Sequence, residues 1–203
     1  MKPFKTIFGA LVAFSFAAPV WAEKLPLSAI SDYFNNMSTA QATFVQHNDD
    51  GSQTSGQMFI RRPGRIRFEY AAPNDSLVLA SGGQVAIFDP KSNQPPERFP
   101  LNKTPLKLIL ARNVDLSTAN MVVGHTEDAQ FTSIFAQDPK RPELGTIQLV
   151  FSDNPVVLRK WIVTDGSGQR TTVVLGEFKY NQTLRNRLFS IRREMTSRGF
   201  EEP

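Results

Sequence analysis

GQMFIRRPGRIRFEYAAP, the stretch from Gly56 to Pro73, shows the pattern that most of this chain follows. Two alternating runs flank Pro63-Gly64, a dipeptide typical of turns because proline fixes one dihedral angle and glycine accepts a positive φ. Side chains alternate between the two faces of a strand, so the stretch predicts a hairpin with unlike faces. One face carries Gly56, Met58, Ile60, Ile66, Phe68 and Tyr70, and the other carries Gln57, Phe59, Arg61, Arg65, Arg67 and Glu69.

Arg62 ends the apolar row, in step with Met58 and Ile60. If it points inward it needs hydrogen-bond partners, because burying a lone guanidinium costs several kcal/mol. The alternative is a surface arginine at the turn, like Arg61 and Arg65 beside it. Strand parity favours the inward position and leaves its partner to be found.

The N-terminus has the features of a secretory signal peptide. Lys2 and Lys5 precede an apolar run from Ile7 to Ala18, and Val20-Trp21-Ala22 offers small residues at the cleavage positions. Residues 1–22 are therefore predicted to be removed. A membrane anchor is the alternative, but the apolar run is short for a span. The sequence contains no cysteine, so neither lipidation of this chain nor a disulfide is expected. We expect export to the periplasm.

Residues 23–203 are predicted to form one domain. The signal peptide takes two lysines from 23 basic residues against 19 acidic ones, which leaves a net charge of about +2. This charge is too small to indicate a nucleic-acid partner. The length suits one substantial core, and a monomer is expected.

Beyond residue 40 the hydrophobic period is mostly two. An amphipathic helix is expected over Leu27–Met37, and turn residues separate the short strands that follow. Short links favour an antiparallel sheet. The expected strands are Gln41–His47, Ser55–Arg62, Arg65–Tyr70, Ser76–Ala80, Gln84–Asp89, Glu97–Pro100, Asn120–His125, Gln130–Ala136, Thr146–Ser152, Val157–Thr164, Arg170–Tyr180 and Leu188–Arg193.

One segment interrupts the strands. Thr104-Pro105 resembles a helix start with a capping threonine, and Arg112-Asn113 suits a helix end. Between them Leu106, Leu108, Ile109 and Leu110 make the helix apolar almost all round, so it must lie against more than one surface. It is either a buried core helix or a lid. The interruption of the strand series favours a lid.

The predicted fold is mainly β: an unclosed antiparallel half-barrel of about eleven strands with a helical lid. A sheet of this size leaves room inside beyond what its own side chains fill. Twelve of the 16 phenylalanines remain after the signal peptide. A lining of Phe and Leu with few polar groups suits alkyl chains better than sugars or nucleotides.

Several of these segments together resemble the LolA family of periplasmic outer-membrane lipoprotein carriers. The resemblance rests on Phe44-Val45-Gln46, residues 56–63, Phe68-Glu69-Tyr70, Phe88-Asp89-Pro90, Thr104-Pro105-Leu106, Leu110-Ala111-Arg112-Asn113, and Trp161 with Asp165. Arg-Pro after an alternating strand, followed by Thr-Pro-Leu and Ala-Arg-Asn, is its strongest part. The run Trp161–Asp165 looks most like the α-proteobacterial branch.

The resemblance implies a carrier of acylated lipoproteins without enzymatic activity or cofactor. Its implied partners are lipoproteins, an inner-membrane lipoprotein-releasing ABC transporter and an outer-membrane receptor. It also implies that Arg62 hydrogen-bonds lid carbonyls near Leu110 and Ala111 as a latch. The expected acyl-chain-binding residues are Met58, Ile60, Ile66, Phe68, Tyr70, Phe88, Leu106, Ile109 and Leu110. For any single one of the strand residues, ordinary sheet core is an equal alternative.

Two segments depart from the family pattern. The lid helix carries one extra residue, and the sequence beyond Phe189 lacks the usual proline-containing end. The basic residues of the C-terminal region suit a solvated face, or anionic lipid headgroups as a lesser alternative; they are Arg185, Arg187, Arg192, Arg193 and Arg198.

Two other functions remain. A lipid-sensing signalling or envelope-assembly protein could use the same half-barrel, although 181 residues leave no room for a second domain. A lipid hydrolase ranks last, because His47 and His125 lie far apart without a motif for a nucleophile or a metal.

Overall fold

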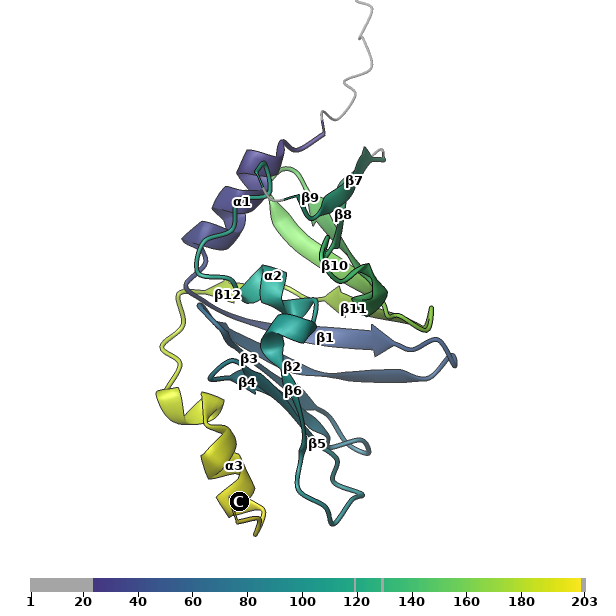
Figure 1. The fold of residues 1–203 in the computed structure, drawn as a ribbon. Coiled ribbons are helices and arrows are strands. Elements are labelled where there is room, and N and C mark those ends of the chain that lie inside the picture. The colour runs from purple at the N-terminus through teal and green to yellow at the C-terminus, as the bar shows by residue number, and fades with distance from the viewer. Residues whose placement is uncertain (1–23, 119, 129, 202–203) are drawn as a thin grey trace, which may run out of the picture.

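The computed structural model describes residues 24–118, 120–128 and 130–201, and the predicted signal peptide lies outside them. Twelve strands form one antiparallel sheet that curls around an apolar interior (Figure 1). Along the sheet the order is β6-β5-β4-β3-β2-β1-β11-β10-β9-β8-β7, and β12 pairs with β1. The strands are β1 (Thr39–His47), β2 (Gln53–Arg61), β3 (Arg65–Tyr70), β4 (Leu77–Ser81), β5 (Gln84–Phe88), β6 (Glu97–Pro100), β7 (Val122–Glu127), β8 (Phe131–Gln137), β9 (Thr146–Ser152), β10 (Val157–Thr164), β11 (Arg170–Leu175) and β12 (Lys179–Tyr180).

The barrel is unclosed, as the sequence predicted. Its edge strands are β6 and β7, and the described residues contain no ladder between them. The segment between these strands holds the 3-10 turn η1 (Leu101–Lys103) and the short helix α2 (Leu106–Leu110), which lie over the concave side with α1 (Leu27–Asn36) (Figure 1). Two helices therefore cover the interior of a half-barrel, and the predicted fold class is confirmed.

The β2–β3 hairpin has the predicted two-faced arrangement. Met58 pairs with Phe68 and Ile60 with Ile66, and all four side chains are buried in the main core. Gly56 has to be a glycine for steric reasons: a Cβ there would lie 2.0 Å from the Glu69 carbonyl oxygen. Close approach of two strands at this point fixes the register of the hairpin.

Three details of the lid and the following strands differ from prediction. Helix α2 has five residues and ends before Arg112 and Asn113. Thr104 does not cap it, since its hydroxyl donates to the Leu101 carbonyl at 2.9 Å. The predicted strand over 170–180 breaks at Gly176, where a Cβ would meet the Thr43 hydroxyl at 2.2 Å, so that β12 pairs separately with β1.

The predicted strand Leu188–Arg193 is wrong. This part of the chain forms the 3-10 turn η3 (Asn186–Phe189) and the helix α3 (Ile191–Ser197), which pack on the convex face of the sheet. Ile191, Met195 and Arg198 recur at helical spacing, and the Ser190 hydroxyl accepts a hydrogen bond from the Arg193 N–H as a cap. The C-terminal segment therefore lies on the opposite side of the sheet from the lid.

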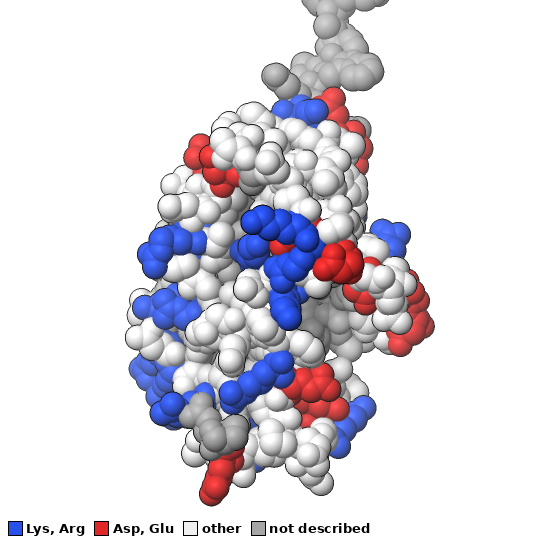
Figure 2. Space-filling model, viewed as in Figure 1, with Lys and Arg blue, Asp and Glu red and all other residues white. Residues whose placement is uncertain are grey.

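Arginines of the hairpin hold the C-terminal segment in place. Arg61 donates to the Leu184 carbonyl at 2.7 Å, and Arg67 donates to the Leu188 carbonyl at 3.2 Å. Arg67 also pairs with Glu194 at 3.0 Å. Figure 2 shows Lys and Arg side chains in a column down the side where α3 lies. The polar face of the hairpin thus has a structural role of its own.

Candidate functional site

The interior face of the sheet and the two lid helices form one continuous apolar cluster. Met58, Ile60, Ile66 and Ile109 are fully buried in it. Phe68 and Leu110 are also buried there, while Tyr70 and Leu106 are partly buried against it. The structure therefore brings eight of the nine predicted lining residues together.

Phe88 is the exception, because it does not line the interior. It is buried in the second cluster, on the convex face, with Phe189 and Met195 of the C-terminal segment. The physical reason is strand parity: Val85 faces the interior, so Phe88, three positions on, faces outward. Sequence reasoning had placed Phe88 by family resemblance, without its register.

Sequence reasoning missed several large interior residues. Phe34 of α1 and Phe151 of β9 are fully buried and pack edge to face, with ring centroids 5.9 Å apart. Trp161 of β10 is buried beside Phe68, with centroids 6.0 Å apart. The alternation of Leu149 with Phe151 was a signal that could have identified the β9 residue. The helical spacing that predicted α1 already placed Ile30 and Phe34 on its apolar face, although Phe34 was not among the predicted lining residues.

Arg62 joins the sheet to the lid. Its side-chain Nη2 donates to the Ala111 carbonyl oxygen at 2.6 Å, and its guanidinium carbon lies 5.9 Å from the centre of the Phe34 ring. The Leu110 carbonyl accepts instead from the backbone N–H of Gly64 at 2.9 Å. Residues at the hairpin turn therefore satisfy two of the carbonyls that the end of α2 leaves without intrahelical partners.

The environment of Arg62 makes this contact a modest one. Burial lowers the pKa of Arg62, although a guanidinium stays protonated in proteins. Its Nε is buried and has no hydrogen-bond partner among the described residues. A buried donor left unpaired opposes the closed state, so part of the gain from the bond to Ala111 is offset.

The loop after α2 is fastened to α1. The Asn35 side chain donates to the Val114 carbonyl at 2.8 Å and accepts from the Val114 N–H at 2.9 Å. The Ser31 hydroxyl accepts from the Leu116 N–H at 3.0 Å. These hydrogen bonds hold α1 and the segment after α2 together above the apolar interior.

The described residues include no helix that is both long and apolar enough to cross a membrane. No group of three potential metal-ligating side chains occurs within 24–118, 120–128 and 130–201. His125 contacts the N-terminal segment, with its Nε2 2.9 Å from the Leu25 carbonyl oxygen. The geometry of the interior is therefore that of a roofed apolar surface with a polar contact at one margin.

Known proteins share this sequence over most of its length. A family model described as outer membrane lipoprotein carrier protein LolA matches residues 35–192. An outer-membrane lipoprotein carrier protein of Azotobacter vinelandii is 28% identical over 193 residues, with 91% of each chain covered. A protein of the same description from Coxiella burnetii is 26% identical over 212 residues, with 99% of this chain and 98% of the relative covered. None of these matches tests the resemblance to the α-proteobacterial branch, which stays a prediction.

Among solved structures, a LolA superfamily protein from Nitrosomonas europaea is similar with a TM-score of 0.43 and 12% identity. The similarity covers 83% of this chain and 98% of that chain. At this score it supports no conclusion beyond the sequence matches.

Proposed function

The chain belongs to the family of the outer membrane lipoprotein carrier protein LolA, and we propose that it is a periplasmic carrier of lipoproteins. In this proposal the interior takes up the acyl chains of lipoproteins released from the inner membrane. The protein then carries them to the outer membrane. The observation that carries the proposal is an apolar interior roofed by two helices, with Arg62 bonded to the lid at its margin.

The closed interior is filled by the side chains of the lid itself. Phe34, Ile109 and Leu110 are at most 2% exposed. Acyl chains would take the place of these side chains against Met58, Ile60, Ile66 and Phe68 when the lid opens. The exchange of one apolar partner for another explains how a tightly filled protein can still bind lipid.

The energetics suit a carrier. Each buried methylene contributes about 0.8 kcal/mol, so several acyl chains bind tightly without polar recognition. Closure of the empty lid opposes binding, because the bonds to the Leu110 and Ala111 carbonyls are lost on opening. Cargo is then released to an acceptor whose apolar site binds the acyl chains better than the carrier does.

The proposed partners follow from this cycle. We propose that cargo comes from an inner-membrane lipoprotein-releasing ABC transporter, since an acylated protein needs help to leave a bilayer. Delivery requires an acceptor at the outer membrane, for which a lipoprotein receptor is the expected form.

Depletion of the protein tests the proposal. Cells depleted of it should accumulate outer-membrane lipoproteins in the inner membrane, measured by fractionation and immunoblotting. Restoring the wild-type gene is the control and should return the lipoproteins to the outer membrane. Normal lipoprotein sorting in fully depleted cells would contradict the proposal.

A further inference from the structure

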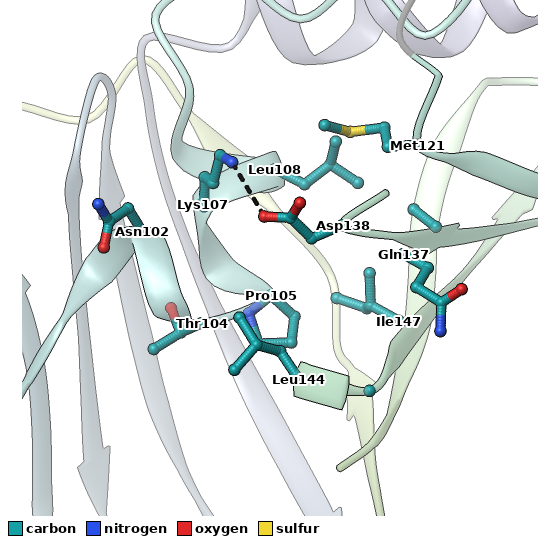
Figure 3. A pocket seen from close by; sticks show the side chains of 12 residues that line it. Asn102, Thr104, Pro105, Lys107, Leu108, Met121, Gln137, Asp138, Leu144 and Ile147 are labelled. Atoms are coloured by element: carbon teal, nitrogen blue, oxygen red, sulfur yellow. Dashed lines mark ion pairs between the residues drawn. The ribbon is translucent and has the colours of Figure 1, made fainter. Parts of the chain in front are cut away.

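A pocket lies where the lid segment bridges the two edges of the unclosed barrel. It lies between the lid segment and the β8–β9 region and has a cavity volume of about 50 Å³ (Figure 3). Leu108 of α2 and Ile147 of β9 line it, and both also belong to the main apolar core. Leu144 of η2 (Pro142–Leu144) adds apolar surface on the sheet side. We call this space the seam pocket.

A charged rim spans the seam pocket; it consists of Lys107 and Asp138, which line the pocket, and Arg141, which pairs with Asp138. Lys107 Nζ of α2 lies 3.5 Å from Asp138 Oδ2, which follows β8, and Figure 3 shows this ion pair across the pocket. Arg141 also pairs with Asp138 at 3.1 Å and donates to the Asn102 carbonyl oxygen in η1. These contacts cross from the lid segment to the β8–β9 loop, between parts of the chain that share no strand ladder.

The two attachments of α2 differ in strength. On the hairpin side, the Leu110 carbonyl is held by a backbone N–H and the Ala111 carbonyl by Arg62. On the other side, the Lys107 side chain is 46% exposed, and ion pairs this exposed contribute little to stability. The Arg141 bond reaches η1 and not α2, so the rim side of α2 is the weaker of its two attachments.

We infer that the seam pocket is the port through which a single acyl chain reaches the core, with the Lys107–Asp138–Arg141 rim as its gate. This inference rests on the proposed function and adds the route of the ligand. The apolar end of the chain would slide between Leu108 and Ile147, while its polar head stays among the charged and amide groups of the rim. The apolar floor and polar rim match an alkyl chain that carries a polar head.

The protein contains a natural fluorescent probe for the arrival of an acyl chain in the core. Trp161 is the only tryptophan among the described residues, and it is buried in the main core. Bromine atoms on an alkyl chain quench tryptophan fluorescence on contact, so brominated palmitic acid reports arrival in the core. The sequence contains no cysteine, so introduced cysteines can be linked specifically.

The test uses the processed periplasmic protein with Lys107→Cys and Asp138→Cys, joined by a short cleavable bismaleimide. Linked protein should lose quenching of Trp161 over a period in which the cleaved protein is fully quenched. The control pair is Gln41→Cys with Gln57→Cys, whose native side chains are hydrogen-bonded at 2.9 Å on the sheet. Linking the control pair should leave the quenching unchanged.

The single variant Asp138→Asn gives a second measurement. It keeps an oxygen that can accept from the Lys140 N–H but removes the charge that holds Lys107 and Arg141. Uptake of brominated palmitic acid should become a few-fold faster than in wild type.

The outcomes separate the two proposals. Equal quenching in linked and cleaved protein would overturn the port while leaving lipid binding intact. An unchanged uptake rate in Asp138→Asn would overturn the gate. If wild-type protein is never quenched, the interior does not take up acyl chains, and both the proposed function and the port fail.

Discussion

Arg62 makes a charge-assisted hydrogen bond to the Ala111 carbonyl and leaves its Nε unpaired. A hydrogen bond to a charged group contributes about 1.5–3 kcal/mol, which corresponds to about tenfold to a hundredfold in an equilibrium between closed and open lids. A contact of this size holds the lid shut without preventing opening. We propose that Arg62 acts as the latch of the carrier.

Replacing Arg62 tests the latch. Arg62→Leu should load acylated cargo but transfer it poorly to an acceptor, because the lid has lost a bond that drives re-closure. Arg62→Lys should behave almost the same, since an ammonium lacks the planar fork of a guanidinium. The measurement is the rate of transfer of a loaded lipoprotein to an outer-membrane acceptor, with Arg65→Leu as the control. Transfer by Arg62→Leu at the wild-type rate would show that Arg62 is only a turn residue.

Gly56 allows a separate test of the hairpin. In Gly56→Ala the new methyl group would meet the Glu69 carbonyl oxygen at 2.0 Å and the Phe44 ring at 2.9 Å, so the strands must move apart. Overpacking of this kind costs about 1–3 kcal/mol. Urea denaturation should show a lower midpoint for Gly56→Ala and an unchanged one for Ser55→Ala. Equal midpoints would mean that the backbone adjusts without cost.

At the residue scale, the sequence predicted which face of a strand a side chain occupies better than it predicted which group that side chain bonds. Alternation alone placed Met58, Ile60, Ile66 and Phe68 on one buried face. It did not identify the group that Arg62 bonds, because the lid carbonyl lies 49 positions away in sequence. Only the family resemblance pointed to Ala111. The Lys107–Asp138 pair had no signal at all, because it depends on which strands form the open edges.

Among the elements, those defined by clear alternation were predicted well. Arg65–Tyr70, Glu97–Pro100, Thr146–Ser152 and Val157–Thr164 have the predicted bounds. Helix α2 was predicted too long, since Arg112 and Asn113 favour a helix end by propensity but tertiary contacts of Leu110 and Ala111 end it earlier. The C-terminal segment was misassigned because two short apolar stretches fit either period over a few residues.

The docking of the C-terminal segment on the sheet should weaken in acid. Burial raises the pKa of Glu194, but hydrogen bonds from Arg67 and Arg198 outweigh it, and the pKa lies below its ordinary value of 4.5. A lowered pKa means that docking favours the charged carboxylate. The contribution is therefore complete above about pH 4.5 and is lost as the pH falls through the lowered value.

Hydrogen exchange of residues 186–200 measures this effect. In wild type, protection of this segment should fall between roughly pH 5 and roughly pH 3. In Glu194→Gln it should be weaker at neutral pH and change less over the same interval. A variant with the wild-type pH profile would show that Glu194 does not hold the segment.

In the whole molecule, the two edge strands of the sheet and the lid act together as one unit that can open. Sequence periodicity predicted an unclosed barrel of about eleven strands but could not give the strand order or show that β6 and β7 are the edges. Those edges are bridged by η1 and α2, so the lid covers the interior and spans the gap at once (Figure 1). A half-barrel closed by a short helix can open without breaking a strand ladder, as a carrier requires.

The identity of the bound ligand is the most direct test of the carrier. The protein should be purified from periplasmic extract without detergent, and whatever copurifies with it should be identified by mass spectrometry. We predict acylated lipoproteins, in amounts that rise when transfer is slowed by Arg62→Leu. Recovery of free glycolipid or lipopolysaccharide without any acylated protein would contradict the carrier function and favour a lipid sensor built on the same half-barrel.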